Sequence, residues 1–84
     1  MSLKFEHCIY TFDASTNDGR EAEVDVVLEP VVRSDGTHLE TTCKVYQYGH
    51  LVYSKFRPGV TALTYTLAKK IAAECLHWAK DDLK

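Results

Sequence analysis

The sequence lacks every motif that would identify a catalytic or cofactor-binding site. Its 84 residues contain no glycine-rich phosphate loop, no C-x-x-C pair and no paired-carboxylate motif. Glycine occurs four times and proline twice, and no apolar run approaches the roughly 20 residues that a helix needs to cross a bilayer. We therefore expect no cofactor, no metal site, no membrane-spanning segment and no enzymatic activity.

Charge of one sign is also not in excess, since the net charge is −2. This balance argues against non-specific binding to a polyanion. The hydrophobic fraction of 45% and the charged fraction of 26% are typical of a folded domain, and the length predicts a single domain over residues 1–84. The N-terminus has no apolar segment of the kind found in signal peptides, so none is expected.

Cysteine is scarce and odd in number: the chain contains Cys8, Cys43 and Cys75. An odd count without metal-type spacing is poor evidence for a disulfide framework, so we expect reduced, mostly buried thiols in a cytoplasmic protein. Cys75 and His77 lie two apart in a helical segment, where side chains point in different directions. They are therefore not expected to share a metal ion.

The hydrophobic period changes near Pro58. Before it, apolar residues alternate with polar ones, as in strands, and after it they recur at helical spacing. We predict an α+β fold in which a four-stranded antiparallel meander sheet carries one long C-terminal helix on one face. The predicted strands span 4–12, 21–33, 37–47 and 50–56. The predicted helix begins at an N-cap on Thr61 and ends near Leu83.

Two tight turns set the predicted strand register. A two-residue turn at Asp35-Gly36 places Val26 opposite Val45, and one at Tyr48-Gly49 places Val45 opposite Val52. Both turns direct the apolar residues of the sheet to one face. The first strand remains open, because either Phe5, His7 and Ile9 or Cys8, Tyr10 and Phe12 could face the core.

The helix has one apolar stripe, which should cover that face of the sheet. Its members are Leu63, Leu67, Ala68, Ile71, Ala72, Cys75, Leu76 and Ala79. We expect a buried cluster that includes Leu28, Val45, Val52, Leu67 and Ile71.

One helix can cover only one face of the sheet, so the opposite, outer face should be exposed. The predicted register places tyrosine, leucine and lysine side chains there, a composition found at protein interfaces. The predicted partner-contact residues are Val27, Lys44, Tyr46, Leu51 and Tyr53. The leading hypothesis is a small non-enzymatic protein-interaction module, of regulator or inhibitor type, that uses the outer face or an edge strand. A homodimer or another protein partner is expected.

Nucleic-acid binding is the alternative hypothesis. Lys69, Lys70 and Lys80 lie on the predicted helix and could contact phosphates, while the sheet tyrosines could stack on bases. The two hypotheses differ in the expected salt dependence, because affinity for phosphates falls steeply as salt rises.

Overall fold

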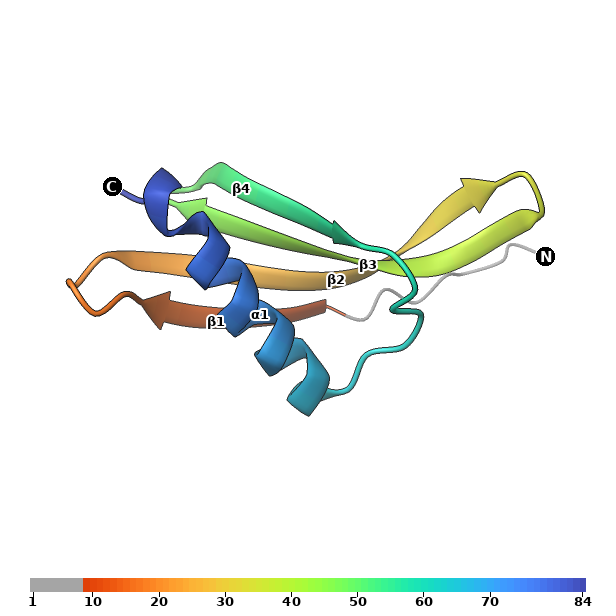
Figure 1. The fold of residues 1–84 in the computed structure, drawn as a ribbon, viewed down its shortest axis with the longest axis horizontal. Coiled ribbons are helices and arrows are strands. Elements are labelled where there is room, and N and C mark those ends of the chain that lie inside the picture. The colour runs from red at the N-terminus through yellow and green to blue at the C-terminus, as the bar shows by residue number, and fades with distance from the viewer. Residues whose placement is uncertain (1–8) are drawn as a thin grey trace.

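The computed structural model describes residues 9–84, which form one sheet and one α-helix. The strands β1 (Ile9–Ser15), β2 (Glu21–Arg33), β3 (Gly36–Gln47) and β4 (His50–Arg57) are antiparallel neighbours in chain order. The helix α1 (Tyr65–Ala79) crosses one face of the sheet and ends in a 3₁₀ turn, η1 (Lys80–Asp82) (Figure 1). The predicted α+β meander is confirmed.

The hairpin between β2 and β3 extends beyond the helix, which makes the molecule elongated, at 48 × 23 × 22 Å (Figure 1). Its register differs from the prediction. The turn is Ser34-Asp35, so Arg33 opposes Gly36 and Val26 opposes Cys43 rather than Val45. Gly36 has a φ of +126°, which only glycine adopts readily, and it begins β3 instead of occupying the turn. Because the shift equals two residues, every side chain keeps its predicted face.

The turn between β3 and β4 is Tyr48-Gly49, as predicted, with positive φ at both residues. The register changes soon after it: Tyr46 opposes Leu51, but Val45 opposes Tyr53. Val52 is therefore the extra residue of a β-bulge, and both Val52 and Tyr53 pack against the core. The predicted pairing of Val45 with Val52 is wrong.

The bulge exchanges the two faces for the rest of β4. Tyr53, which was predicted to point outward, therefore lies on the helix side, together with Lys55 and Arg57. Phe56 moves the opposite way, to the outer face, where it is 41% exposed. The prediction that Tyr53 lies on the outer face is therefore wrong, because the strand register after the bulge is shifted by one residue.

In the described part of β1, Tyr10, Phe12 and Ala14 point toward the helix and pack against the core. This agrees with the second of the two alternatives for the first strand. Residues 4–8 of that predicted strand lie outside the described residues.

The helix begins later than predicted. Its N-cap is Thr64, whose Oγ1 accepts a hydrogen bond from the Leu67 amide at 3.2 Å, and Thr61 precedes it in an extended segment. Ala68 is fully buried, whereas the neighbouring Leu67 is 37% exposed. Adjacent residues lie about 100° apart around a helix. The buried stripe is centred on Ala68 and its small neighbours, so Leu67 lies at its margin and the expectation that it belongs to the core is wrong.

The core lies between the helix and the two central strands, with Leu83 at its C-terminal end. Val45 and Ile71 belong to the cluster as expected, and Val52 packs against it, while Leu28 is buried farther along the hairpin. The cluster consists of Val24, Val26, Cys43, Val45, Ala68, Ile71, Ala72, Cys75, Ala79 and Leu83.

Two of the three cysteines are paired. Cys43 and Cys75 are fully buried and form a disulfide between β3 and α1, with their Cα atoms 6.6 Å apart. The expectation of reduced thiols is therefore wrong for these two residues. Each was placed correctly on its own apolar face. The geometry that joins the two faces depends on how the helix crosses the sheet, which the residue spacing did not specify.

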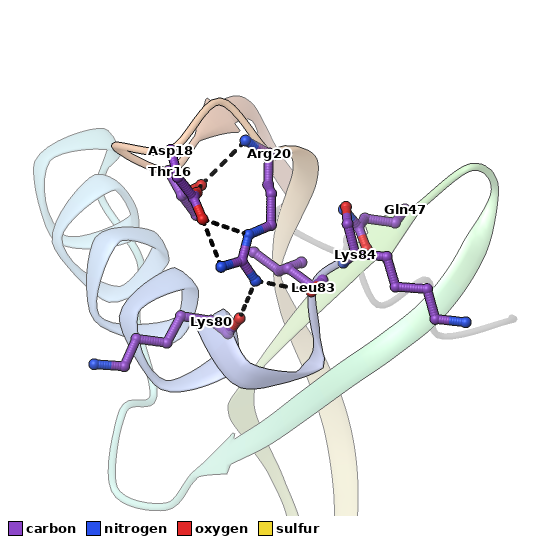
Figure 2. Close-up of polar contacts among 7 residues, drawn as sticks. All are labelled: Thr16, Asp18, Arg20, Gln47, Lys80, Leu83 and Lys84. Carbon is purple, nitrogen blue, oxygen red and sulfur yellow. Dashed lines mark hydrogen bonds and ion pairs between the residues drawn. The ribbon is translucent and has the colours of Figure 1, made fainter.

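Arg20 fixes the end of the helix to the loop between β1 and β2 (Figure 2). Its Nη1 donates to the carbonyl oxygens of Lys80 at 3.0 Å and Leu83 at 2.9 Å. Its Nε donates to Asp18 Oδ2 at 2.7 Å, and the Thr16 hydroxyl donates to the other oxygen of that carboxylate. The arginine thus binds the orphan carbonyls of the last helical turns.

Gln47 holds the last residue of the chain from the other side (Figure 2). Its Oε1 accepts from the Lys84 amide at 2.9 Å, and its Nε2 donates to the carbonyl oxygens of Lys84 and Glu21, each at 3.0 Å. The side chain is 4% exposed, so its polar atoms are buried and satisfied.

No helix among residues 9–84 is long and apolar enough to cross a membrane.

Candidate functional site

The outer face of the sheet, opposite the helix, carries four of the five predicted contact residues. Side chains on one face follow from the strand register, which places Val27, Lys44, Tyr46 and Leu51 there. Tyr53 is the exception: it packs against the core on the helix side and is not part of this surface. The outer face therefore exists as predicted, but its β4 portion has a different composition.

Exposure further restricts the predicted set. Leu51 is 53% exposed and lies directly opposite the half-buried Tyr46, so these two form an accessible pair. Val27 is on the same face but only 7% exposed. A residue with so little accessible surface offers little area to a partner in this conformation.

Lys44 lies between acids on the neighbouring strand. It is opposite Asp25 in the ladder, yet its Nζ lies 3.4 Å from Glu29 Oε1. One oxygen of Asp25 is buried and has no hydrogen-bond partner among the described residues. Burying a carboxylate oxygen without a hydrogen bond costs free energy. A donor that reached this oxygen of Asp25 would therefore stabilise the protein.

The sequence interpretation missed an aromatic contact on this face. Phe56 carries the Arg33 guanidinium 5.8 Å from its ring centroid, and Arg33 also binds Glu40 Oε2 at 2.6 Å through Nη2 and 3.1 Å through Nε. Glu40 is 7% exposed, whereas the Arg33 side chain is 43% exposed, so only the acid of this ion pair is shielded from water. Only the bulge at Val52 brings Phe56 to this face, and the sequence has no Gly or Pro to signal a bulge there.

A hollow of about 870 Å³ lies where the outer face meets the turn between β3 and β4. All of its charged lining residues are acidic, and the lining contains no lysine, arginine or histidine. The lining residues are Asp13, Ala14, Ser15, Glu21, Ala22, Glu23, Asp25, Tyr46, Gln47, Tyr48 and Gly49. Uncompensated carboxylates in a concave surface produce a negative potential, which attracts cationic groups and repels phosphates.

The acids of this hollow are not arranged as metal ligands. Among residues 9–84, no group of three or more His, Cys, Asp or Glu side chains is placed to hold a metal ion. The hollow is therefore described by its shape and its negative potential alone.

The residues of the nucleic-acid alternative do not come together. Lys69, Lys70 and Lys80 are exposed on the helix side of the molecule, whereas Tyr46 is on the outer face. Tyr53 is on the helix side but packs against the core. The helix lysines and Tyr46 therefore lie on opposite sides of the sheet.

A different cationic and aromatic contact occurs at the β4 edge. Lys55 Nζ lies 5.6 Å and Arg57 Cζ 5.3 Å from the ring centroid of Trp78, which is 42% exposed. Arg57 also donates to Glu74 Oε2 at 2.8 Å, so one of the two cations is already paired. The indole face attracts each cation, and because Glu74 pairs with Arg57 the charge of Lys55 leaves this site positive.

Comparison with protein-family descriptions, with curated proteins and with solved structures finds no match for this chain. The molecule has two candidate functional surfaces: the acidic and apolar outer face of the sheet, and the cationic site around Trp78.

Proposed function

We propose that this protein is a small, non-enzymatic protein-interaction module, of regulator or inhibitor type, that uses the outer face of its sheet. The observation that carries the proposal is the position of the exposed Leu51 beside the acidic hollow. An apolar anchor next to charged surface is a common arrangement at protein interfaces.

The chemistry of the outer face limits the kind of partner. Carboxylates line the hollow, and Leu51 with Tyr46 supplies the adjacent apolar area. The complementary partner is a segment with lysine or arginine beside a leucine-sized or aromatic side chain. Polyanions are disfavoured on this face because its potential is negative.

A peptide titration tests this proposal. Amide chemical shifts are followed while a synthetic peptide with alternating arginine and leucine is added, and an otherwise identical peptide with glutamate in place of arginine is the ligand control. We expect shifts confined to the outer face, weakened in Leu51→Ser. The matched protein control is Val32→Ser, which removes an 82% exposed apolar side chain from the extended hairpin. Equal binding by both variants, or shifts centred on the helix, would contradict the proposal.

Nucleic-acid binding stays as a second proposal because Lys55 and Arg57 lie over an exposed indole. Trp78 is the only tryptophan, so its fluorescence reports directly on this site. Single-stranded RNA should quench the emission by stacking, with an apparent affinity that falls as salt rises. Emission that is unchanged by RNA at low salt would eliminate this second function.

The cytoplasmic location proposed from the sequence has lost its main support. It depended on reduced cysteines, whereas Cys43 and Cys75 are joined. Disulfides persist mainly in oxidising compartments. The redox state of these cysteines in the protein isolated from cells under thiol-blocking conditions tests the location.

A further inference from the structure

The two edges of the sheet differ in how well they are protected against pairing with another strand. The β4 edge is interrupted by the bulge at Val52, and its Lys55 and Arg57 point toward the helix side. Bulges and inward-pointing charges are devices that prevent edge strands from pairing. The β4 edge therefore has two such devices within a short strand.

The β1 edge has neither device. Its register with β2 is uninterrupted from Ile9 to Ser15, and the strand contains no proline, lysine or arginine. Asp13 is its only charged residue. Among residues 9–84, β1 pairs only with β2, so its other side is a regular, nearly uncharged edge.

The backbone direction along β1 follows from one hydrogen bond at its end. The Thr16 amide donates to the Arg20 carbonyl at 2.8 Å, which makes this opposed pair a hydrogen-bonded pair. Such pairs alternate along an antiparallel ladder. The amides of Phe12 and Ala14 therefore point toward β2, and those of Thr11 and Asp13 point toward the open edge.

We propose that a second copy of this chain occupies this edge, its β1 pairing antiparallel with the first so that the two sheets become continuous. A two-fold axis at Phe12 uses the whole strand and sets Thr11 opposite Asp13 of the other copy. A shift of two residues in one direction would place Asp13 opposite Asp13. A shift of two residues in either direction also leaves two residues of each described strand unpaired. Charge and overlap thus select the same register.

The aromatic residues at this edge support the same arrangement. Phe12 and Tyr10 lie 5.7 Å and 6.2 Å from the Tyr65 ring, measured between centroids, and Tyr65 is 59% exposed. In the proposed register the two Phe12 residues form a non-hydrogen-bonded pair, in which side chains approach most closely. The two aromatic clusters would then join on the helix side and bury area that is exposed in one copy.

The experiment measures both mass and amide exchange. Light scattering over a concentration series should show the wild-type chain passing from one to two copies. Thr11→Pro removes a donor at the open edge and no bond to β2, so we expect its dimer dissociation constant to rise by at least about tenfold while the circular dichroism is unchanged. Thr11→Val keeps the amide and is the matched control, with wild-type association expected.

Hydrogen exchange of the wild-type chain provides a readout that does not depend on a variant. The amides of Thr11 and Asp13 should exchange slowly at high concentration and quickly after dilution, whereas that of Phe12 should be protected at both. A monomer at all concentrations, or a dimer in which Thr11 and Asp13 exchange quickly, would overturn the proposal. A dimer lost in Leu51→Ser but kept in Thr11→Pro would assign association to the outer face instead, so this inference and the proposed function can fail separately.

Discussion

Cys43 at the centre of the sheet and Cys75 in the middle of the helix form a disulfide across the core. The bond closes a loop whose ends are 32 residues apart and which includes β4 and most of α1. The helix makes its remaining contacts with the sheet mainly through alanine-sized side chains. A covalent link between the two layers is therefore a large part of what holds the helix in place.

Reduction of this bond should destabilise the fold. Chain-entropy arguments give about 3–4 kcal/mol for a loop of this length, a large share of the stability of a small domain. Urea unfolding of the oxidised and reduced protein, and of the double variant Cys43→Ala/Cys75→Ala, measures the loss. Before reduction, the unfolded chain should titrate one thiol rather than three. Three free thiols in freshly isolated, unreduced protein would show that the bond does not form.

The core should depend on Ile71 more than on Leu67. Ile71 is 2% exposed and Leu67 is 37% exposed. Ile71→Ala should cost about 2–5 kcal/mol, because it leaves a cavity between helix and sheet, and Leu67→Ala should cost less than half of that. Both values come from denaturant unfolding of the oxidised protein. An equal loss in the two variants would mean that Leu67 is packed more completely than its exposure indicates.

Sequence periodicity was sufficient to predict the strands and the helix, but not to predict on which face of the sheet every side chain lies. Alternation and helical spacing identified all four strands and the helix, because each element has one apolar side that must be buried. A two-residue register shift between β2 and β3 went undetected, because it leaves the faces unchanged. The bulge at Val52 changed the surface, since one extra residue moved Tyr53 inward and Phe56 outward.

The candidate site was predictable to the same degree. Tyr46 and Leu51 lie between the turn and the bulge, where the predicted register holds, and they are paired on the outer face as expected. The contact of Arg33 with Phe56 depends on the bulge and could not be inferred. The hollow also depends on how the strands twist relative to one another, a property that residue spacing does not contain.

The C-terminal end of the chain should be coupled to Gln47. Replacing this side chain by Gln47→Ala removes three hydrogen bonds, to the carbonyl oxygens of Glu21 and Lys84 and from the Lys84 amide, so we expect a loss of about 1–3 kcal/mol. Deleting Leu83 and Lys84 should also destabilise the protein. The double variant should lose less than the sum of the two, since both changes break the same contacts. Additive losses would show that Gln47 stabilises the hairpin alone.

Asp18 should make the stability of the loop end sensitive to acid. Hydrogen bonds from Arg20 and then Thr16 lower the pKa of the Asp18 carboxyl from 3.8 to about 2. Because the folded pKa is below the unfolded one, the stabilisation is fully present above about pH 4 and is lost as the pH falls through about 2. Protonation also weakens the contact that orients Arg20 toward the carbonyls of Lys80 and Leu83.

Asp18→Asn measures this contribution directly. At neutral pH the variant should unfold at a lower urea concentration than the wild type, and the gap should close as the pH falls through about 2, where the wild-type carboxyl becomes protonated. Asp82→Asn is the matched control: this exposed acid of η1 has no ion pair among the described residues, and it should follow the wild-type profile. A gap of the same size at every pH would attribute the loss to the change of side chain rather than to the charge that Arg20 binds.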